Sequence, residues 1–478
     1  MVTIEAGALR RARWAVLAAF FANGAAFATW APRIPAVQEA LSLDATMLGL
    51  ALTGGALGGV LFTLPGGIIV DRLGSRRALL VAIASLSLLL VLPGLAPGWW
   101  FLLAAMLVLG AVDSLMDVAM NAHGVLLEQR EGRSLLSGFH ASWSIGAVLG
   151  GLAGAAAAAA GIPVWAHLLA AGALLGTATL LAGRGLLDQR ESPHAGAAGS
   201  NAASNNAASN SAASNSAACN SAASNSAASN TAASNSAASN DAARSSAASN
   251  SAARNSFDNS AADDSAASNI AGREKSTSRI ARPTPILVVA GLLVLAAAFI
   301  EDVPLSWSAV YFSTGLGASA GVAGLGFVAF SFFMAAGRIV GDRVTDRFGT
   351  PRVLLGGGLL IATGFAAGLA INQPLAAIAG FALVGLGASP IFPAAFSVAG
   401  RSAGGASGIA FVSMVSRFGF LTAPLLVGIL ADATDFRYAL GVVVLAGAVV
   451  AVLSRKLRRE LPAGDPSAAG AVPAYDRP

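Results

Sequence analysis

Stretches of about twenty mostly apolar residues recur along the chain, and short polar segments separate them. A helix of that length rises about 30 Å, which is the thickness of the hydrocarbon core of a bilayer. The pattern predicts an all-α polytopic membrane protein with about twelve transmembrane helices. The predicted spans lie near residues 14–32, 46–70, 78–95, 99–127, 134–160, 163–183, 284–312, 321–341, 352–370, 375–399, 405–431 and 436–454.

The segment between the sixth and seventh spans breaks this pattern. From Asn201 to about Asn269, the sequence Ala-Ala-Ser-Asn-x recurs with a fixed short period. Alanine is its only regular apolar residue, so the segment cannot bury enough surface to offset its conformational entropy. We therefore predict four parts: an N-terminal six-helix bundle over 1–190, a disordered cytoplasmic linker over 191–283, a C-terminal six-helix bundle over 284–456 and a disordered cytoplasmic tail over 457–478.

Basic residues indicate how the chain is oriented. Most of the 29 lysines and arginines lie in alternate loops, whereas Arg33 and Arg437 lie in loops on the other side. Because basic loops stay in the cytoplasm, we expect both termini there. The preference for arginine over lysine is typical of a GC-rich bacterial genome, which favours a bacterial inner membrane. The single cysteine, Cys219, excludes an intramolecular disulfide.

Two similar polar corners interrupt the apolar pattern at matching places in the two halves. In each corner, an apolar run with glycine leads into an Asp-Arg pair, a glycine and further basic residues. Glycine permits a tight turn, and the arginines hold the corner in the cytoplasm. The repeat predicts two six-helix bundles related by a pseudo-two-fold axis. The corner residues singled out are Gly67, Asp71, Arg72, Gly74 and Arg76 in the first half, and Gly341, Asp346, Arg347 and Gly349 in the second.

The pattern Gly-x-x-x-Asp-Arg-x-Gly resembles the signature gating loop of major facilitator superfamily transporters. The second copy is less well preserved, because Asp342 stands at the position of Gly67. Further stretches, such as Trp30 to Pro35, resemble a bacterial branch that includes the rhizopine-associated membrane protein and is distantly similar to fucose–proton symporters. The resemblance implies a secondary transporter that works by alternating access. It also implies that Asp71 pairs with the inner end of span 11 and closes the cytoplasmic side.

Ionisable groups inside a span are costly, so each one is a functional candidate. Span 4 carries Asp113, Asp117 and Asn121 on one helical face. Counting from Glu128 places Asp117 about 16 Å deep, where a carboxyl group can take up and release a proton. A structural hydrogen bond to a neighbouring helix is the alternative. In the symporters that this branch resembles, an acid in helix 4 takes part in proton coupling, and Asp117 matches its position.

Span 7 carries Glu301 and Asp302 side by side, and successive residues of a helix point in different directions. We expect one of the two to face a central cavity, and we favour Glu301 as a proton-coupling group. The alternative places both acids near the outer headgroups, where water solvates them. Pro304 is expected to break the helix, as in discontinuous transporter helices. Trp307 is a candidate solute contact.

Arg417 lies about 18 Å inside span 11, counted from Gly405. A guanidinium at this depth needs an anionic partner, which is either a group of the transported solute or one of the acids above. A static ion pair that only fixes packing is the alternative. Asn23 and Trp30 in span 1 complete the candidate solute contacts, together with Asn121. Trp30 also fits an anchor at the outer membrane interface.

Together these features favour proton-coupled uptake of a small polar solute, such as a sugar or a cyclitol. Two alternatives stay open: a proton-driven exporter of drugs or metabolites, and a non-transporting receptor or scaffold. The sequence contains no metal-spaced His/Cys cluster, phosphate-binding loop or nucleophile elbow, so we expect no enzyme activity, no cofactor and no metal. The expected partners are the solute, the lipid bilayer and the proton gradient, without nucleic acid, and the protein is expected to be a monomer.

Overall fold

The computed structural model describes residues 6–131, 135–187, 284–401 and 406–460. Within these ranges all regular structure is helical, and twelve helices are long and apolar enough to cross a membrane. The prediction of an all-α protein with twelve spans is confirmed. The predicted linker over 191–283 lies outside the described residues. The last helix continues to Glu460, and the rest of the predicted tail also lies outside them.

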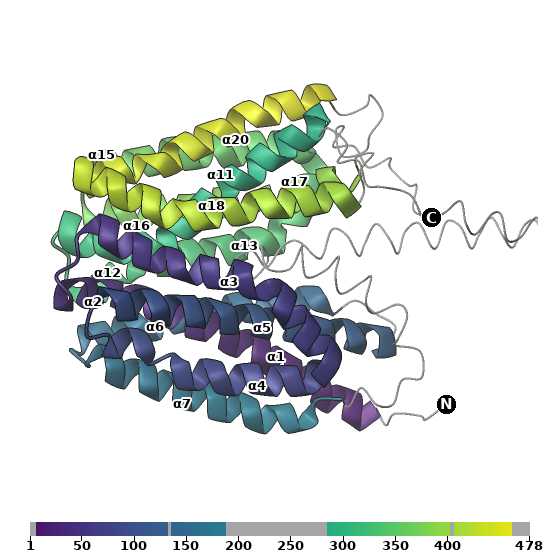
Figure 1. Ribbon diagram of the computed structural model, residues 1–478. Helices are drawn as coiled ribbons and strands as arrows, with labels where there is room; N and C mark the ends of the chain where they lie inside the picture. Colours follow the sequence, from purple (N-terminus) through teal and green to yellow (C-terminus); the bar gives the residue numbers. More distant parts are fainter. Residues whose placement is uncertain (1–5, 132–134, 188–283, 402–405, 461–478) are drawn as a thin grey trace, which may run out of the picture.

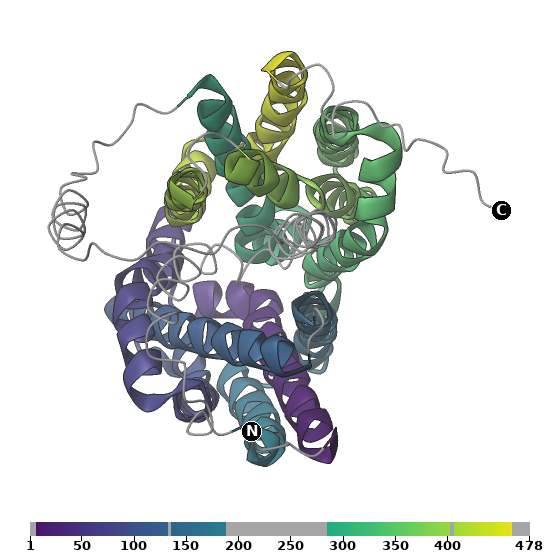
Figure 2. The ribbon, with the colours of Figure 1, turned by 90° about the vertical axis from the view of Figure 1, so that its right-hand side faces the viewer.

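The first six spans form one bundle (Figures 1 and 2). Its α1 and α6 approach each other closely, because Gly146 and Gly150 of α6 face the backbone of α1 at Phe21 and Ala25, where a side chain would clash. The helices are α1 (Ala6–Trp30), α2 (Ile34–Ala40), α3 (Ala45–Leu73), α4 (Ser75–Leu89), α5 (Trp99–Glu131), α6 (Leu136–Ala159) and α7 (Val164–Ala182).

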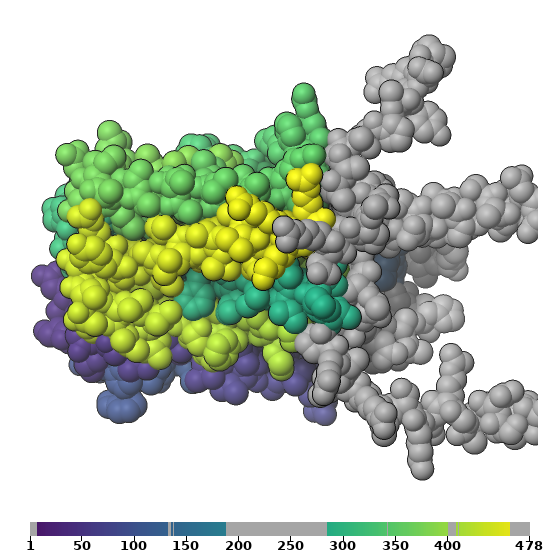
Figure 3. Space-filling view, turned by 90° about the horizontal axis from the view of Figure 1, so that it is seen from above, coloured from purple at the N-terminus to yellow at the C-terminus, as the bar shows by residue number. Residues whose placement is uncertain are grey.

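The last six spans form the second bundle, and Figure 3 shows α20 beside the start of α11 on its surface. Two π-helical turns, Tyr311–Gly315 and Leu360–Phe365, extend α11 and join α14 to α15. The helices are α11 (Pro285–Val310), α12 (Ala320–Ala323), α13 (Leu325–Phe348), α14 (Thr350–Leu359), α15 (Ala366–Ile371), α16 (Pro374–Ala388), α17 (Ile391–Arg401), α18 (Ala406–Ala433), α19 (Phe436–Ala439) and α20 (Gly441–Glu460).

The two polar corners have nearly the same backbone geometry. Gly74 alone separates α3 from α4, with φ 82° and ψ 149°, and Gly349 alone separates α13 from α14, with φ 79° and ψ 146°. Glycine adopts these positive φ angles without the steric cost that other residues meet. Asp71 and Asp346 therefore belong to the last turns of α3 and α13 rather than to extended loops.

The helix α11 passes Pro304 without interruption, so the expected break at this proline is wrong. A proline inside a helix removes one backbone hydrogen bond, but close packing by neighbouring helices can hold such a helix together. Here α18 and α20 pack along α11. The acids of α11 are therefore presented by a continuous helix.

The two faces of the helix array differ in charge. The helix α1 begins and α20 ends at one face, on the right in Figure 1, and both polar corners lie there. We call it the basic face, because the exposed Arg72, Arg77, Arg343 and Arg347 lie in the corners. The other end of the helices is called the opposite face.

Contacts between the bundles concentrate toward the opposite face. There α3 packs against α18, and α6 packs against α12 and the first turns of α13. Gly324 of the second bundle, for example, lies against Pro32 and Ala155 of the first. The structure is therefore closed at the opposite face.

Candidate functional site

A cavity that we call the main cavity lies between the bundles. The first bundle contributes Asn23, Trp30 and Asp113 to its wall, and the second contributes Asp302 and Arg417. Four of these five residues were predicted from the sequence as solute or proton contacts. Much of the remaining wall is apolar and includes Phe27, Leu52, Met106 and Phe420. A few charged groups in an apolar, buried wall are typical of a small-molecule site.

A chain of hydrogen bonds orients Asp113 within the first bundle. The indole Nε1 of Trp143 donates to Oδ1 of Asn23 over 2.8 Å, and Nδ2 of Asn23 donates to Oδ1 of Asp113 over 2.7 Å. Because indole is only a donor, it fixes the amide of Asn23 with its oxygen toward Trp143 and its NH₂ group toward Asp113. The close packing of α1 on α6 holds this chain in place. Sequence reasoning did not select Trp143.

Arg417 connects the bundles. Its Nη1 donates to Oγ1 of Thr63 in α3 over 3.0 Å, and Thr63 in turn lies 3.1 Å from Oγ of Ser114. Asp117 of α5 attracts the guanidinium electrostatically. An acidic group close enough to interact electrostatically with Arg417 is thus present in the other bundle.

Asp117 and Asn121 lie nearer than Asp113 to the end of α5 at the basic face, and they do not line the main cavity. The side chain of Asp117 is fully buried, and Nδ2 of Asn121 donates to its Oδ1 over 2.9 Å. This bond stays within α5, whereas the alternative interpretation of Asp117 was a hydrogen bond to a neighbouring helix. The second oxygen of Asp117, Oδ2, has no hydrogen-bond partner among the described residues.

Glu301 and Asp302 face different cavities. Asp302 lines the main cavity and accepts a hydrogen bond from Oγ of Ser306, whereas Glu301 lines a smaller second cavity. Only 5% of Glu301 and 7% of Asp302 is exposed, so the alternative in which water near the headgroups solvates both acids is wrong. The cavity-facing acid in the main cavity is Asp302, not the favoured Glu301.

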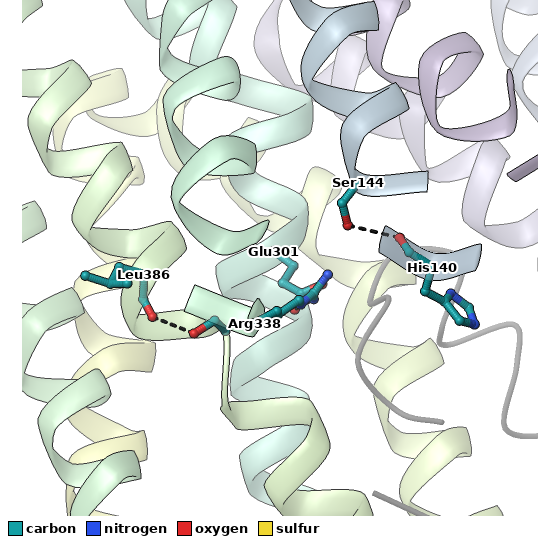
Figure 4. Close-up of polar contacts among 6 residues, drawn as sticks. His140, Ser144, Glu301, Arg338 and Leu386 are labelled. Atoms are coloured by element: carbon teal, nitrogen blue, oxygen red, sulfur yellow. Dashed lines mark hydrogen bonds and ion pairs between the residues drawn. The ribbon is translucent and has the colours of Figure 1, made fainter. Parts of the chain in front are cut away.

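The second cavity contains an ion pair between neighbouring helices of the second bundle. Oε1 of Glu301 lies 3.2 Å from Nη2 of Arg338 in α13 (Figure 4). Trp143 and Ser144 of α6 form part of the wall, and the imidazole of His140 points away from the pair. Sequence reasoning missed Arg338, although it lies near the end of the predicted span 321–341. An ionisable residue inside a predicted span was the available signal.

The two predicted tryptophans differ in their surroundings. Trp30 lines the main cavity and is almost buried, so it does not act as an interface anchor. Trp307 is fully buried, and its ring packs against Phe436 with centroids 5.7 Å apart. Trp307 lines neither the main cavity nor the smaller second cavity beside Glu301, and its role as a solute contact stays a prediction.

The corner residues lie apart from both cavities, at the basic face. The side chains of Asp71, Arg72, Asp346 and Arg347 are exposed. Asp71 makes no hydrogen bond or ion pair with the described part of the chain, and its predicted partner near Gly405 lies outside that part. The gating role of the corners therefore stays a prediction.

Comparison with known proteins identifies the family. Residues 16–300 and 287–474 match the family described as the Major Facilitator Superfamily. The chain belongs to the Major Facilitator Superfamily. It is therefore a multi-pass membrane transporter for small molecules and not an enzyme. The repeated corners had predicted the transporter family.

Three relatives align over nearly the whole chain. The chain is 27% identical to an uncharacterised MFS-type transporter of Yersinia pestis, over 92% of this chain and 94% of that protein. It is 28% identical to the uncharacterised transporter y4wD of Sinorhizobium fredii, over 93% and 97%. It is 26% identical to membrane protein MosC of Rhizobium meliloti, over 92% and 88%. The similarity to MosC supports the predicted branch.

Solved structures show the same fold at low sequence identity. A mutant of the nucleoside transporter NupG superimposes with a TM-score of 0.64 at 10% identity, covering 93% of this chain and 99% of that one. A bacterial homologue of the lysosomal transporter Spinster, in an inward-facing and unoccupied conformation, gives 0.63 at 13% identity, covering 96% and 100%. These likenesses confirm the transporter fold.

Proposed function

We propose that this transporter takes up a small polar solute, sugar-like or cyclitol-like, together with protons across a bacterial inner membrane. The observation that carries the proposal is the main cavity, whose polar groups come from both bundles. In this proposal the basic face and both termini lie in the cytoplasm, because basic loops are retained there. A single chain supplies both walls of the cavity, so a monomer is sufficient for transport.

Contacts with both bundles are what let a solute drive alternating access. A ligand shifts a conformational equilibrium only by its difference in affinity for the two states. In the main cavity a polar solute can bind Asn23 and Trp30 on one side and Arg417 on the other. When the bundles rock, the distances from the solute to the two walls of the main cavity change together. The solute therefore favours the states in which both walls contact it.

Buried carboxyl groups provide the proposed proton path. Asp117 attracts Arg417 across the gap between the bundles, and protonation of Asp117 removes that attraction. Asp113, next along the face of α5, links this site to the main cavity. Glu301 offers another proton site, since its Oε2 is buried without a hydrogen-bond donor among the described residues. Proton binding would thereby weaken the contact between the two bundles that solute binding strengthens.

The structure corresponds to an inward-facing state in the proposed orientation. Its bundles meet at the opposite face, which would lie outside the cell, and Asp71 at the basic face is exposed. Closing the basic face would bring Asp71 to the start of α18, as the resemblance implies. A carboxylate at a helix start is favoured by the partial positive charge there.

The test uses proteoliposomes with a trapped pH dye and a panel of sugars, polyols, organic acids and drugs. We expect one external polyol or sugar to acidify the lumen of vesicles with the wild type, and Asp117→Asn to abolish this signal. The matched control, Glu39→Gln, removes an exposed carboxylate and should transport normally. Alkalinisation by a solute would replace import by proton-driven export. Absence of flux with every solute would favour the receptor or scaffold reading.

A further inference from the structure

A carboxylate of the second bundle binds the start of a helix of the first bundle. Oδ1 of Asp432, near the end of α18, accepts the backbone N–H of Ala45 over 3.0 Å, and Oδ2 accepts that of Thr46 over 2.7 Å. The first N–H groups of an α-helix have no partner within the helix, and the helix dipole favours an anion there. Asp432 therefore caps α3 from across the interface. The sequence gives no direct sign of this contact.

Close backbone packing makes the contact possible. Gly428 of α18 lies against the backbone of Ala45, and Gly49 of α3 lies against the backbone of Pro424. A Cβ atom at either glycine would clash with that backbone, so glycine lets the two helices approach at the opposite face. Asp432 then reaches the exposed N–H groups without leaving its own helix.

The second contact region at the opposite face has a different character. There Ala155 and Ala159 of α6 pack against Gly324 and Gly321 of the second bundle. These small residues pack well but offer no charged side chain. The directional, charge-assisted contact between the bundles at this face is thus concentrated on the α3–α18 pair.

We infer that Asp432 is a positioning residue of the transport cycle: its two hydrogen bonds to α3 hold the opposite face closed. They must break when the bundles part at that face, so they stabilise only one of the two states. The inference rests on alternating access as proposed above. Asp432 and Asp71 occupy the C-terminal ends of α18 and α3, at opposite faces of the same helix pair. Each carboxylate lies at the end where the partner helix begins.

The chain contains a matched control for this role. Asp44 also caps α3, because its Oδ1 accepts the backbone N–H of Met47 over 2.7 Å. Asp44 belongs to the first bundle, however, and its bond does not cross the interface. Loss of Asp44 weakens the same helix end and leaves the inter-bundle contact in place.

The experiment measures the distance across the opposite face in full-length protein reconstituted in lipid nanodiscs. Spin labels are attached to cysteines at the exposed Ala40 and Tyr438, one in each bundle, after Cys219→Ser. Asp432→Ala and the near-isosteric Asp432→Asn should raise the ratio of long to short distances by roughly 5- to 30-fold, the effect expected of a lost charge-assisted bond pair. Asp44→Ala should leave the ratio unchanged.

Two results would overturn the inference. One is a distance distribution for both Asp432 variants that matches the wild type, and the other is an equal shift with Asp44→Ala. The readout needs no transported solute, so its outcome is separate from that of the flux assay. A chain whose distances shift as expected, yet which moves no solute of the panel, supports the role of Asp432 and refutes the proposed uptake.

Discussion

Glu301 and Asp302 are neighbours in α11, yet Asp302 lines the main cavity and Glu301 lines the second cavity. Successive residues of a helix point about 100° apart, so Glu301 and Asp302 cannot face the same space. Which one faces the main cavity depends on the rotation of α11 about its axis. Packing against α18 and α20 sets that rotation, and local sequence does not encode it. The sequence could therefore predict the pair but not the choice within it.

Because Asp302 and Glu301 line different cavities, replacing each of them is predicted to impair the transporter in a different way. Asp302→Asn removes a charged group from the main cavity and should raise the KM for the solute that drives proton flux by roughly 10-fold. Its thermal stability should stay close to that of the wild type. Glu301→Gln removes the charge that pairs with Arg338, so it should lower the melting temperature and leave KM within about 2-fold.

Uptake kinetics and thermal unfolding of the two purified variants check this assignment. The pair is its own control, because the two substitutions are adjacent and chemically alike. If Glu301→Gln raised KM as strongly as Asp302→Asn, the second cavity would also bind solute, and the division drawn here would be wrong.

Arg338 was missed for a physical reason as well. It stands near the end of a predicted span, just before a basic corner, where an arginine is normally retained by the cytoplasmic surface. Only the three-dimensional structure shows that its side chain turns inward to Glu301. Arg417, by contrast, lies mid-span, where no surface role is available, and its importance could be predicted from depth alone.

At the scale of helices, the first corner contains two glycines, Gly67 and Gly74, that have different structural roles. Gly74 has φ 82°, and replacing it with alanine should lower the free energy of unfolding by about 1–2 kcal/mol. Gly67 is helical, and a Cβ there would meet no atom within 4 Å. Gly67→Ala should therefore be neutral or slightly stabilising. Denaturant unfolding in detergent compares the two variants, and an equal loss of stability would contradict this reading of the corner.

Asp71 is predicted to act only when the basic face closes. Because its side chain is exposed here, Asp71→Asn should leave the melting temperature unchanged. It should slow solute flux several-fold, since the state closed at the basic face would lose its latch. Flux in proteoliposomes at equal protein content measures the effect. A normal rate would show that the latch implied by the family resemblance is absent in this chain.

The helices themselves were the most predictable elements. Their lengths follow from the thickness of the hydrocarbon core, and this constraint applies to every span alike. The exact ends were less predictable, because α3 and α13 continue through their Asp-Arg pairs up to Gly74 and Gly349. At both corners the polar Asp-Arg pair ends the apolar span, but the helix itself continues and ends only at the glycine.

At the scale of the molecule, two related bundles could be predicted from the repeated corner, but their relative position could not. Which face is closed depends on a difference of a few kcal/mol between two sets of contacts. Contacts such as those of Asp432 with Ala45 and Thr46 join residues far apart in sequence, and no local sequence pattern predicts them. The sequence defines the two rigid parts, and the interface between them selects the state.

Cys219 gives a direct test of how the molecule sits in the membrane. The helix α7 ends and α11 begins at the basic face, and the sequence of residues 188–283 between them has no apolar stretch long enough to cross a bilayer. If the basic face is cytoplasmic, an impermeant maleimide should label Cys219 in right-side-out vesicles only after permeabilisation. A Cys219→Ser chain with Glu39→Cys, at the opposite face, should be labelled in intact vesicles. The reverse pattern would place Asp432 inside the cell and turn the observed state into an outward-facing one, so the proposed direction of uptake depends on this result.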